Sequence, residues 1–345
     1  FNIPGAGPHR IVVLSDLPTI SDPLIIDGAT QPGADCSAWP PTLNIQLDGE
    51  MRSGSLIGLS VNASGGAVRG LVISRFRDHG IRIHASDVKV QCNFIGTDPS
   101  GTQDMGNGVS GSWRAGVWVS GTLPGVGQRN IIGVDGNDGH GVFLNGYYTS
   151  DNLIAGNFIG VNKNGMQALG NTQSGVDLST PNTTIGGALP AMRNVIAGNA
   201  NGIYISGGAN NQVIGNYVGV NTAGNAAIPN QNNGIMLGFT TLDARITGNL
   251  VSGNGQYGIF VWVGPDRCTL QGNVIGADAS GSAALGNTLG GITMQVNDCL
   301  IGGPNPADRN LIAFNGGHGI IIQRNSARNR VQANRIFANG TLGID

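Results

Sequence analysis

Residues 152–160 read Asn-Leu-Ile-Ala-Gly-Asn-Phe-Ile-Gly, and after a polar loop the chain continues with Gly175-Val176-Asp177-Leu178. The second motif is a Gly followed by Ile or Val, any residue and another apolar residue, and it returns along most of the chain. Its ten copies, the last of them incomplete, begin at Gly80, Gly116, Gly141, Gly175, Gly202, Gly234, Gly258, Gly291, Gly319 and Gly343. The steps between copies range from 24 to 36 residues. A repeat of this length indicates a solenoid, a propeller or a linear array.

The composition favours strands over helices. Charged residues make up 11% of the chain, with a single Glu (Glu50) and two Lys (Lys89 and Lys163), whereas Gly occurs 59 times. Glu and Lys are among the residues that exposed helix faces use most, so a helical solenoid is excluded. β-Branched residues separated by Gly and Asn instead predict many short strands joined by turns.

Two repeat types alternate along the chain. The long type carries Gly-Asn-x-Ile/Val-Gly before its loop, and it occurs at 152–178, 211–237, 268–294 and, with Cys92 in place of the Gly, 90–119. The short type carries Arg-Asn before its second strand, and it occurs at 184–205 and 300–322. Strands that recur once per repeat lie parallel to their counterparts, and each coil buries its inward side chains only by stacking on its neighbours. We therefore expect an all-β, right-handed parallel β-helix of roughly ten or more coils.

A recurring Asn follows one strand of many coils, usually directly after a Gly. Its copies are Asn93, Asn157, Asn216, Asn249, Asn273 and Asn334. We expect these Asn in left-handed or bridge backbone geometry at a bend. Their amides can then hydrogen-bond the turn backbone and the equivalent Asn of the adjacent coils.

These motifs resemble the right-handed parallel β-helix, or pectate-lyase-like, superfamily, and more narrowly the Gly-Asn-x-Ile-Gly repeats of large secreted bacterial surface proteins. The resemblance covers residues 56–345, which we interpret as one continuous domain, while residues 1–55 look like N-terminal coils of the same group. It implies a secreted or cell-surface protein. It does not imply one activity, because the superfamily includes polysaccharide lyases, hydrolases, esterases, epimerases, phage tailspikes and adhesins.

The Gly-Val-x-Leu strand predicts which side chains face outward, because its two aliphatic residues point inward. The outward x positions form a column of Arg82, Trp118, Phe143, Asp177, Tyr204, Met236, Phe260, Thr293 and Ile321. The next outward column contains His84, Ser120, Asn145, Ser179, Ser206, Gly238, Trp262, Gln295 and Gln323. We call these two columns together the outward strip.

Aromatic residues are only 5% of the chain, yet several fall on the outward strip, namely Trp118, Phe143, Tyr204, Phe260 and Trp262. Large exposed apolar patches usually mark binding surfaces. Sugar rings stack on aromatic side chains, and polar neighbours such as Asn145, Ser120 and Ser179 can bond their hydroxyls. Arg82 is a further candidate contact for the substrate. The loop that carries Trp113 could wall the strip into a groove. We therefore expect a polysaccharide ligand, against two alternatives: a structural aromatic ladder, and burial against another subunit or domain.

Asp177 is the candidate catalytic acid, because aromatic neighbours raise the pKa of a carboxyl group. Glycoside hydrolysis requires two carboxylates, and Asp138 is the partner that we nominate. A lyase would instead need a base, for which His140 and Tyr204 are candidates. Against these assignments, His at the position of His140 recurs in other repeats, at His79 and His318.

Charge and cofactor signals are weak. A formal net charge of −2 without a basic tract argues against nucleic acid as a partner. No apolar stretch reaches 18 residues, so we expect no membrane insertion. We predict no cofactor. Calcium stays open, because residues 135–138 resemble the start of a calcium loop without a full ligand set.

Cys268 and Cys299 occupy the same repeat position on consecutive coils. The strand spacing of ~4.8 Å would accept a disulfide, but we favour two stacked buried thiols. The states of Cys36 and Cys92 stay open.

Both chain ends look like cuts in a longer protein, and no signal peptide is found. Two functions remain: a β-helix that binds and could cleave a polysaccharide, or a non-catalytic structural or adhesive module. The sequence also leaves open association into a homo-oligomer, or with neighbouring domains of a longer protein.

Overall fold

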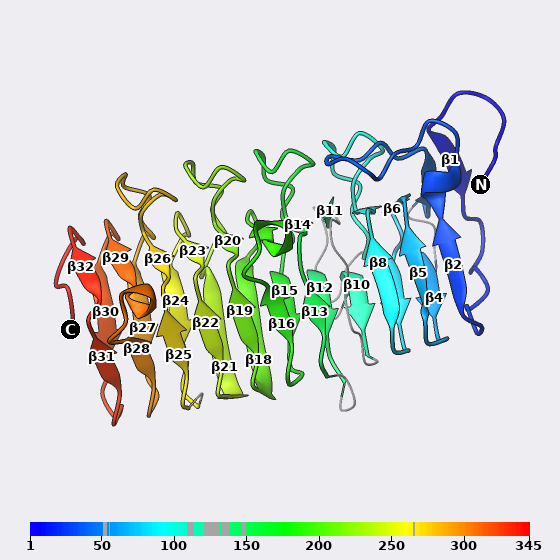
Figure 1. Cartoon of the computed structure of the whole chain (residues 1–345). Coiled ribbons are helices and arrows are strands. Elements are labelled where there is room, and N and C mark those ends of the chain that lie inside the picture. Colours follow the sequence, from blue (N-terminus) through cyan, green and yellow to red (C-terminus); the bar gives the residue numbers. More distant parts are fainter. Residues whose placement is uncertain are drawn as a thin grey trace. The chain divides into compact units, whose positions relative to one another are not determined.

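The computed structural model describes the chain except for residues 51–53, 55, 109–113, 121–130, 133–138, 147–149 and 265. Two compact units make up the chain, Phe1–Asp177 and Leu178–Asp345. Each is built of short strands, and every pairing between the strands below is parallel (Figure 1).

Three parallel sheets form the first unit. One runs through β1 (His9–Val12), β3 (Ile45–Asp48), β6 (Leu71–Ser74), β9 (Phe94–Ile95), β11 (Ile131–Ile132) and β14 (Phe158–Ile159). The second, which carries the Gly-Val-x-Leu motif, runs through β4 (Leu59–Val61), β7 (Ile81–Ile83), β10 (Ala115–Val119), β12 (His140–Leu144) and β15 (Ser174–Leu178). The third contains β2 (Leu24–Asp27), β5 (Gly66–Arg69) and β8 (Val88–Gln91). β13 (Leu153–Ile154) follows later in the chain.

The second unit repeats this plan. Its first sheet runs through β17 (Val195–Ile196), β20 (Tyr217–Val218), β23 (Leu250–Val251), β26 (Val274–Ile275), β29 (Leu311–Ala313) and β32 (Arg335–Phe337). The motif sheet runs through β18 (Asn201–Ala209), β21 (Ile235–Leu242), β24 (Tyr257–Val261), β27 (Gly290–Met294) and β30 (His318–Ile322). The third runs through β16 (Thr184–Gly186), β19 (Gln212–Ile214), β22 (Arg245–Thr247), β25 (Thr269–Gln271), β28 (Leu300–Gly302) and β31 (Arg330–Gln332).

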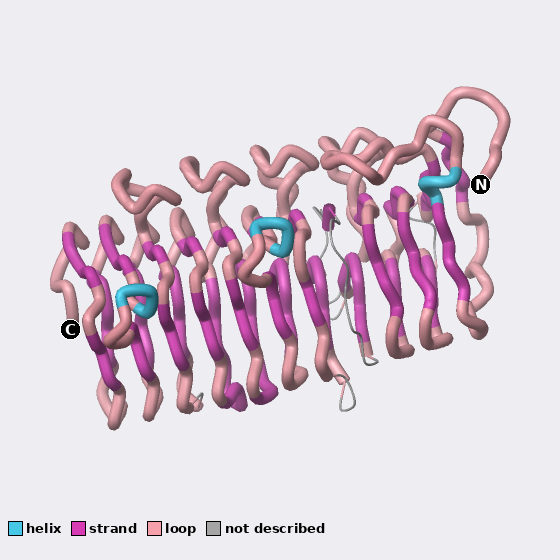
Figure 2. Tube along the Cα trace, in the orientation of Figure 1, coloured by secondary structure: helices cyan, strands magenta, loops and turns pink. Residues whose placement is uncertain are grey.

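Helices are few and short in the described part of the chain (Figure 2). They are the 3₁₀ turns η1 (Gly28–Thr30), η2 (Pro190–Met192) and η3 (Pro306–Asp308). Among the described residues, no helix has the length and apolar character needed to cross a bilayer.

Each strand pairs with the equivalent strand of the next coil, so the predicted fold is confirmed: the chain folds as a right-handed parallel β-helix. Right-handed crossovers are the rule where parallel strands belong to one sheet, because right-handed strand twist favours them.

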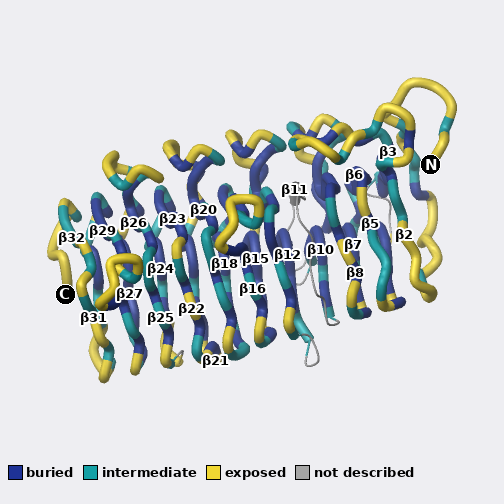
Figure 3. Tube along the Cα trace, viewed as in Figure 1, coloured by how far each residue is buried: buried dark blue, intermediate teal, exposed yellow. Residues whose placement is uncertain are grey.

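The motif aliphatics line the interior, as predicted. Their side chains are at most 1% exposed at Val117, Val119, Val142, Leu144, Ile203, Ile205, Ile235, Leu237, Ile259 and Val261. Figure 3 shows buried residues along the strands and exposed residues on many of the connecting loops. The strand register places Trp118 beside Arg82 and Phe143 in the first unit. In the second unit it places Met236 beside Tyr204 and Phe260, so the residues of the column are neighbours within each unit, although Phe143, Asp177 and Thr293 in it are buried.

Two ladders of Asn side chains run through the second unit, buried except at their last rungs. In both, each Nδ2 donates to the Oδ1 of the next coil at 2.8 to 3.1 Å. The first ladder contains Asn194, Asn216, Asn249, Asn273, Asn310 and Asn334. The second contains Asn199, Asn230, Asn254, Asn287, Asn315 and Asn339. Bonding between equivalent Asn of adjacent coils is therefore confirmed here.

The left-handed residue, however, is not the Asn but the residue before it. Positive φ angles occur at Gly215 (68°), Gly248 (67°), Gly272 (64°) and, where Cys replaces Gly, Cys92 (55°). The chain thus turns one residue before the Asn, whose side chain is then directed into the stack. Gly suits this position because it adopts positive φ without steric cost.

All four cysteines form disulfides, Cys36 with Cys92 and Cys268 with Cys299. The prediction of two buried thiols at Cys268 and Cys299 is therefore wrong. Their Cα atoms lie 4.5 Å apart, because they face each other on stacked coils. The pair Cys36–Cys92 joins positions 56 residues apart. Cys36 lies before residue 56, where the repeat begins.

Removal of one ladder amide should destabilise the fold. Asn249 Nδ2 donates to Val213 O at 2.9 Å and to Asn273 Oδ1 at 3.0 Å, and Asn249 Oδ1 accepts from Asn216 N at 2.9 Å. Asn249→Ala removes these bonds and leaves the buried Asn216 N–H without its acceptor, so we expect the free energy of unfolding to fall by about 3 kcal/mol. Gln231→Ala, at an exposed amide of the same unit, should change it by less than about 0.5 kcal/mol. Urea unfolding monitored by circular dichroism measures both, and equal losses would contradict a special role of the ladder.

Candidate functional site

Two clusters include residues of the outward strip, one in each unit. In the first unit, His79 and His84 pack on Trp118 and His140 packs on Phe143, while the strand register sets Trp118 beside Phe143. We call these five residues the histidine cluster. In the second unit, Phe260, Trp262, Gln295 and Gln323 surround a hollow, which we call the aromatic hollow.

Ring stacking organises the histidine cluster. The His79 ring stacks on Trp118 with 4.9 Å between centroids, and His84 meets Trp118 edge-on at 5.0 Å. His140 stacks on Phe143 at 4.9 Å. Phe143 is consequently only 5% exposed, so the expectation of an exposed aromatic residue is wrong at this position. Trp118 is half-buried.

Burial, modified by nearby charged groups, sets the protonation of His79. Its Nε2 lies 3.2 Å from Asp78 Oδ1, and Asp78 also pairs with Arg114. Burial lowers the pKa of His79 to about 4; Asp78 opposes this shift, whereas Arg114 and Arg82 add to it. The ring is therefore neutral at pH 7, and its Nδ1 accepts a hydrogen bond from the backbone N–H of Ala115 at 3.1 Å.

Two of the predicted catalytic residues meet in the first unit. His140 Nδ1 lies 3.5 Å from Asp177 Oδ2, and both residues are buried, at 6% and 8% exposure. The nominated second carboxylate, Asp138, and the loop residue Trp113 lie outside the described residues. Tyr204 belongs to the second unit.

The remaining predicted residues of the first unit lie on the motif sheet. Arg82 Nη2 donates to Ser60 Oγ at 3.2 Å, so this guanidinium binds the preceding coil. The backbone N–H of Asn145 donates to Val119 O at 3.1 Å. Asn145 therefore lies beside Ser120, which belongs to the preceding coil.

The aromatic hollow has a volume of about 240 Å³. Phe260 and Trp262 meet edge-to-face with 5.3 Å between centroids, and Phe239 lies 6.0 Å from Trp262. Trp262 is 41% exposed and Phe239 is 60% exposed, so these rings face solvent. Tyr204 lies on β18, two strands from Phe260, and its ring packs against Gly238 of the intervening strand β21. Any side chain at position 238 would collide with this ring.

Sequence reasoning assigned no role to Gln295 and Gln323, which line the hollow beside Phe260 and Trp262. The available signal was their place in the second outward column, directly after Trp262 on successive coils. An amide side chain both donates and accepts hydrogen bonds, and so suits a hydroxyl-rich ligand.

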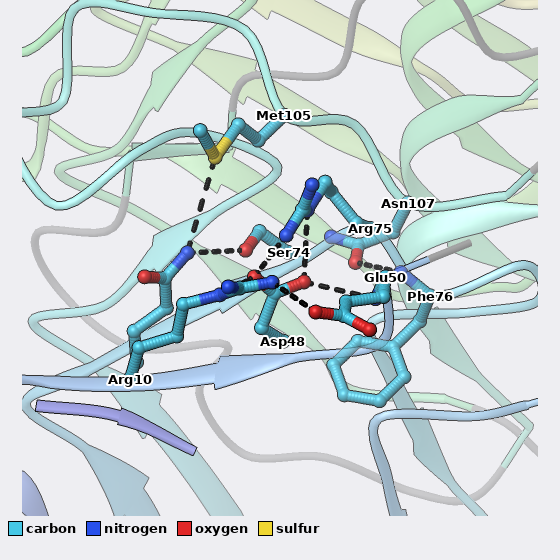
Figure 4. Close-up of polar contacts among 9 residues, drawn as sticks. Arg10, Asp48, Glu50, Ser74, Arg75, Phe76, Met105 and Asn107 are labelled. Carbon is cyan, nitrogen blue, oxygen red and sulfur yellow. Dashed lines mark hydrogen bonds and ion pairs between the residues drawn. The ribbon is translucent and has the colours of Figure 1, made fainter. Parts of the chain in front are cut away.

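A buried ion cluster around Asp48 was also missed (Figure 4). Asp48 accepts from Arg10 Nε at 2.5 Å and from Arg75 Nε at 2.8 Å, and Arg10 also pairs with Glu50. Burial alone would raise the pKa of Asp48, but the two guanidiniums and the Glu50 N–H hold it below its usual value. Each charge is thus compensated, which favours a structural role at the N-terminal coils.

Metal binding finds no support in the part of the chain that the structure describes. There, no three His, Cys, Asp or Glu side chains gather into a ligand set.

The neutral His79 should make stability depend on pH. Because its pKa is about 4 in the folded protein and 6.5 ordinarily, the unfolded chain binds the proton more tightly between these values. The free energy of unfolding should therefore fall as pH drops from 6.5 to 4, by about 3 kcal/mol in total. His79→Asn, which keeps an acceptor for the Ala115 N–H, should flatten this dependence. NMR titration of the ring checks the pKa, and a value near 6.5 would contradict the burial argument.

Comparison with known proteins adds little beyond architecture. No protein-family model matches the chain, and no curated protein matches it in sequence. Among solved structures, the chain is similar to the Dettilon tailspike protein, with 13% identity and a TM-score of 0.44 over 97% of this chain and 61% of that one. It is also similar to the periplasmic alginate epimerase AlgG, with 15% identity and a TM-score of 0.39 over 87% and 74%. A tailspike of an E. coli bacteriophage, solved with a hexasaccharide, is 13% identical, with a TM-score of 0.42 over 96% of this chain and 59% of that one.

The chain thus spans less than two thirds of the length of both tailspikes. Its own strand pairing, coil upon coil, carries the structural assignment: the chain is a right-handed parallel β-helix protein.

Proposed function

We propose that this protein binds a polysaccharide, and that the aromatic hollow of the second unit holds one of its sugar rings. The observation that carries the proposal is the meeting of aromatic rings and amide side chains around one opening, at Phe260, Trp262, Gln295 and Gln323. A sugar ring presents apolar C–H faces that pack on an aromatic ring. Its hydroxyls need donors and acceptors, which the two Gln amides supply.

The exposure of the rings supports a ligand over a purely structural ladder. A structural ladder buries its rings against each other, whereas Trp262 and Phe239 keep 41% and 60% of their surface in solvent. Exposed aromatic patches of this kind usually mark binding surfaces. The histidine cluster, with Phe143 only 5% exposed, is the contrasting case.

The size of the hollow indicates one ring of a longer chain. Its volume of about 240 Å³ lies below the range typical of sites that enclose a whole small molecule, roughly 300–1,000 Å³. Equivalent outward positions recur every ~4.8 Å along the motif sheet, so a polymer lying across the coils could contact several of them.

Trp262→Ala should weaken glycan binding at least about tenfold, which corresponds to about 1.4 kcal/mol, because the largest exposed ring of the hollow is lost. A glycan array identifies the ligand, and calorimetry then measures the affinity of each variant. Leu189→Ala is the matched control, since Leu189 is an exposed apolar residue of the same unit outside the hollow. No bound glycan, or equal affinity of Trp262→Ala and the parent protein, would remove the proposal.

Cleavage is the second candidate, and the approach of His140 to Asp177 favours it. A carboxyl group and an imidazole 3.5 Å apart can exchange a proton, as general acid–base chemistry requires. We keep Asp138 as the second carboxylate of a hydrolase and Tyr204 as the alternative base of a lyase. Arg82, Trp118 and Asn145 remain proposed contacts for the substrate.

If the protein cleaves its glycan, Asp177→Asn should reduce the rate at least about 100-fold, because the proton donor is lost. Reducing-end and unsaturated-product assays on the glycan identified by the array measure this rate. Asp243→Asn is the control, as Asp243 forms an exposed ion pair with Arg267. Binding without any product would instead identify a non-catalytic adhesive module.

The two disulfides support a location outside the cytoplasm. Disulfides persist in oxidising environments such as the periplasm and the cell exterior. A secreted or surface-displayed protein, alone or as a homo-oligomer, therefore remains our proposal.

A further inference from the structure

Three polar side chains follow the motif strands on consecutive coils of the first unit: His84, Ser120 and Asn145. Val119 pairs with Ile83 on one side and with Leu144 on the other. The Ser120 N–H continues this pairing by donating to Ile83 O at 2.9 Å. Ser120 therefore has a histidine on one neighbouring coil and an amide on the other, each about 4.8 Å away along the sheet.

Ser120 and His84 are joined by a hydrogen bond between the serine Oγ and the imidazole Nδ1. With the imidazole proton on Nε2, the hydroxyl donates and Nδ1 accepts. Burial and then the Arg82 guanidinium hold the pKa of His84 below its ordinary value, so the imidazole is an unprotonated base at neutral pH. The Trp118 ring, at 90° to the imidazole and 5.0 Å from it, fixes the orientation of the base.

Ser206, at the same repeat position in the second unit, has a purely structural hydrogen bond for comparison. The Ser206 hydroxyl donates to the Leu178 carbonyl at 3.1 Å. The Ser120 hydroxyl lies farther from the corresponding carbonyl, 3.4 Å from Ile83 O. Ser120 thus has a basic nitrogen as a partner where Ser206 bonds only to backbone.

We propose that Ser120 and His84 form a nucleophile–base pair that hydrolyses small carboxylic esters at the surface of the first unit. Serine becomes nucleophilic when an adjacent base accepts its proton. The exposed His84 and part-exposed Ser120 leave the pair accessible to an ester carried by a larger molecule. Trp118 supplies an apolar surface beside the acyl group.

The reaction balances without a further reactant except water. Ser120 Oγ attacks the carbonyl carbon as its proton moves to His84 Nδ1, and a tetrahedral oxyanion forms. The bond between carbonyl carbon and alcohol oxygen then breaks, and the alcohol leaves with the proton from His84. Water, deprotonated by the same nitrogen, attacks the acyl-serine, releases the carboxylic acid and restores the Ser120 hydroxyl.

The test uses the full chain with p-nitrophenyl acetate as substrate and a fluorophosphonate as covalent probe. We expect hydrolysis above the buffer rate and a probe adduct that peptide mapping locates on Ser120. Ser120→Ala should abolish the adduct, and both Ser120→Ala and His84→Ala should lower the rate at least about 100-fold.

Ser206→Ala is the matched control and should keep both the rate and the adduct. Circular dichroism of each variant identifies loss of folding, and the adduct position in the parent protein is independent of that outcome. An unlabelled Ser120 in the folded parent protein, or equal rates for Ser120→Ala and Ser206→Ala, would overturn the proposal. Neither result depends on glycan binding in the second unit.

Discussion

Hydrogen bonding from coil to coil is the constraint on which the rest of the structure depends. No single coil has enough apolar surface for a core of its own, and its backbone groups find partners only in the coils before and after it. The Asn ladders extend this dependence to side chains. Asn216, Asn249 and Asn273 each donate both to the next rung and to a backbone carbonyl of an earlier coil, so each amide links three coils. Stability in each unit is therefore shared among neighbouring coils.

The same constraint determines which side chains meet at the surface. Because equivalent strands pair in register, residues 22 to 42 positions apart in sequence become neighbours, as in the pairs Val195–Tyr217 and Leu24–Gly66. Phe260 lies beside Thr293, and Trp118 beside Phe143, for this reason alone. Each candidate site is thus a property of two or three successive coils. Insertion of a residue within a coil would move its outward side chains to the inside.

The sequence repeat predicted the architecture and which residues share a column, because the period of the motif reports strand pairing directly. It could not predict how rings pack within a column. The burial of Phe143 depends on the rotamer of His140, which a motif does not specify. Arg10 and Asp48 of the ion cluster lie before residue 56, outside the repeat, so the repeat could not place them beside Arg75. The hollow beside Trp262 was within reach, since Gln295 and Gln323 stood in the right column.

The Cys268–Cys299 disulfide has a mechanical consequence. A β-helix pulled from its two ends would lengthen by peeling coils from the stack one after another. The bond joins two consecutive coils and closes the 31-residue step between them, so tension bypasses that segment. This segment would span about 100 Å if fully extended, and the disulfide prevents that lengthening. Residues 268–299 would therefore not be extended by the force until the disulfide is reduced.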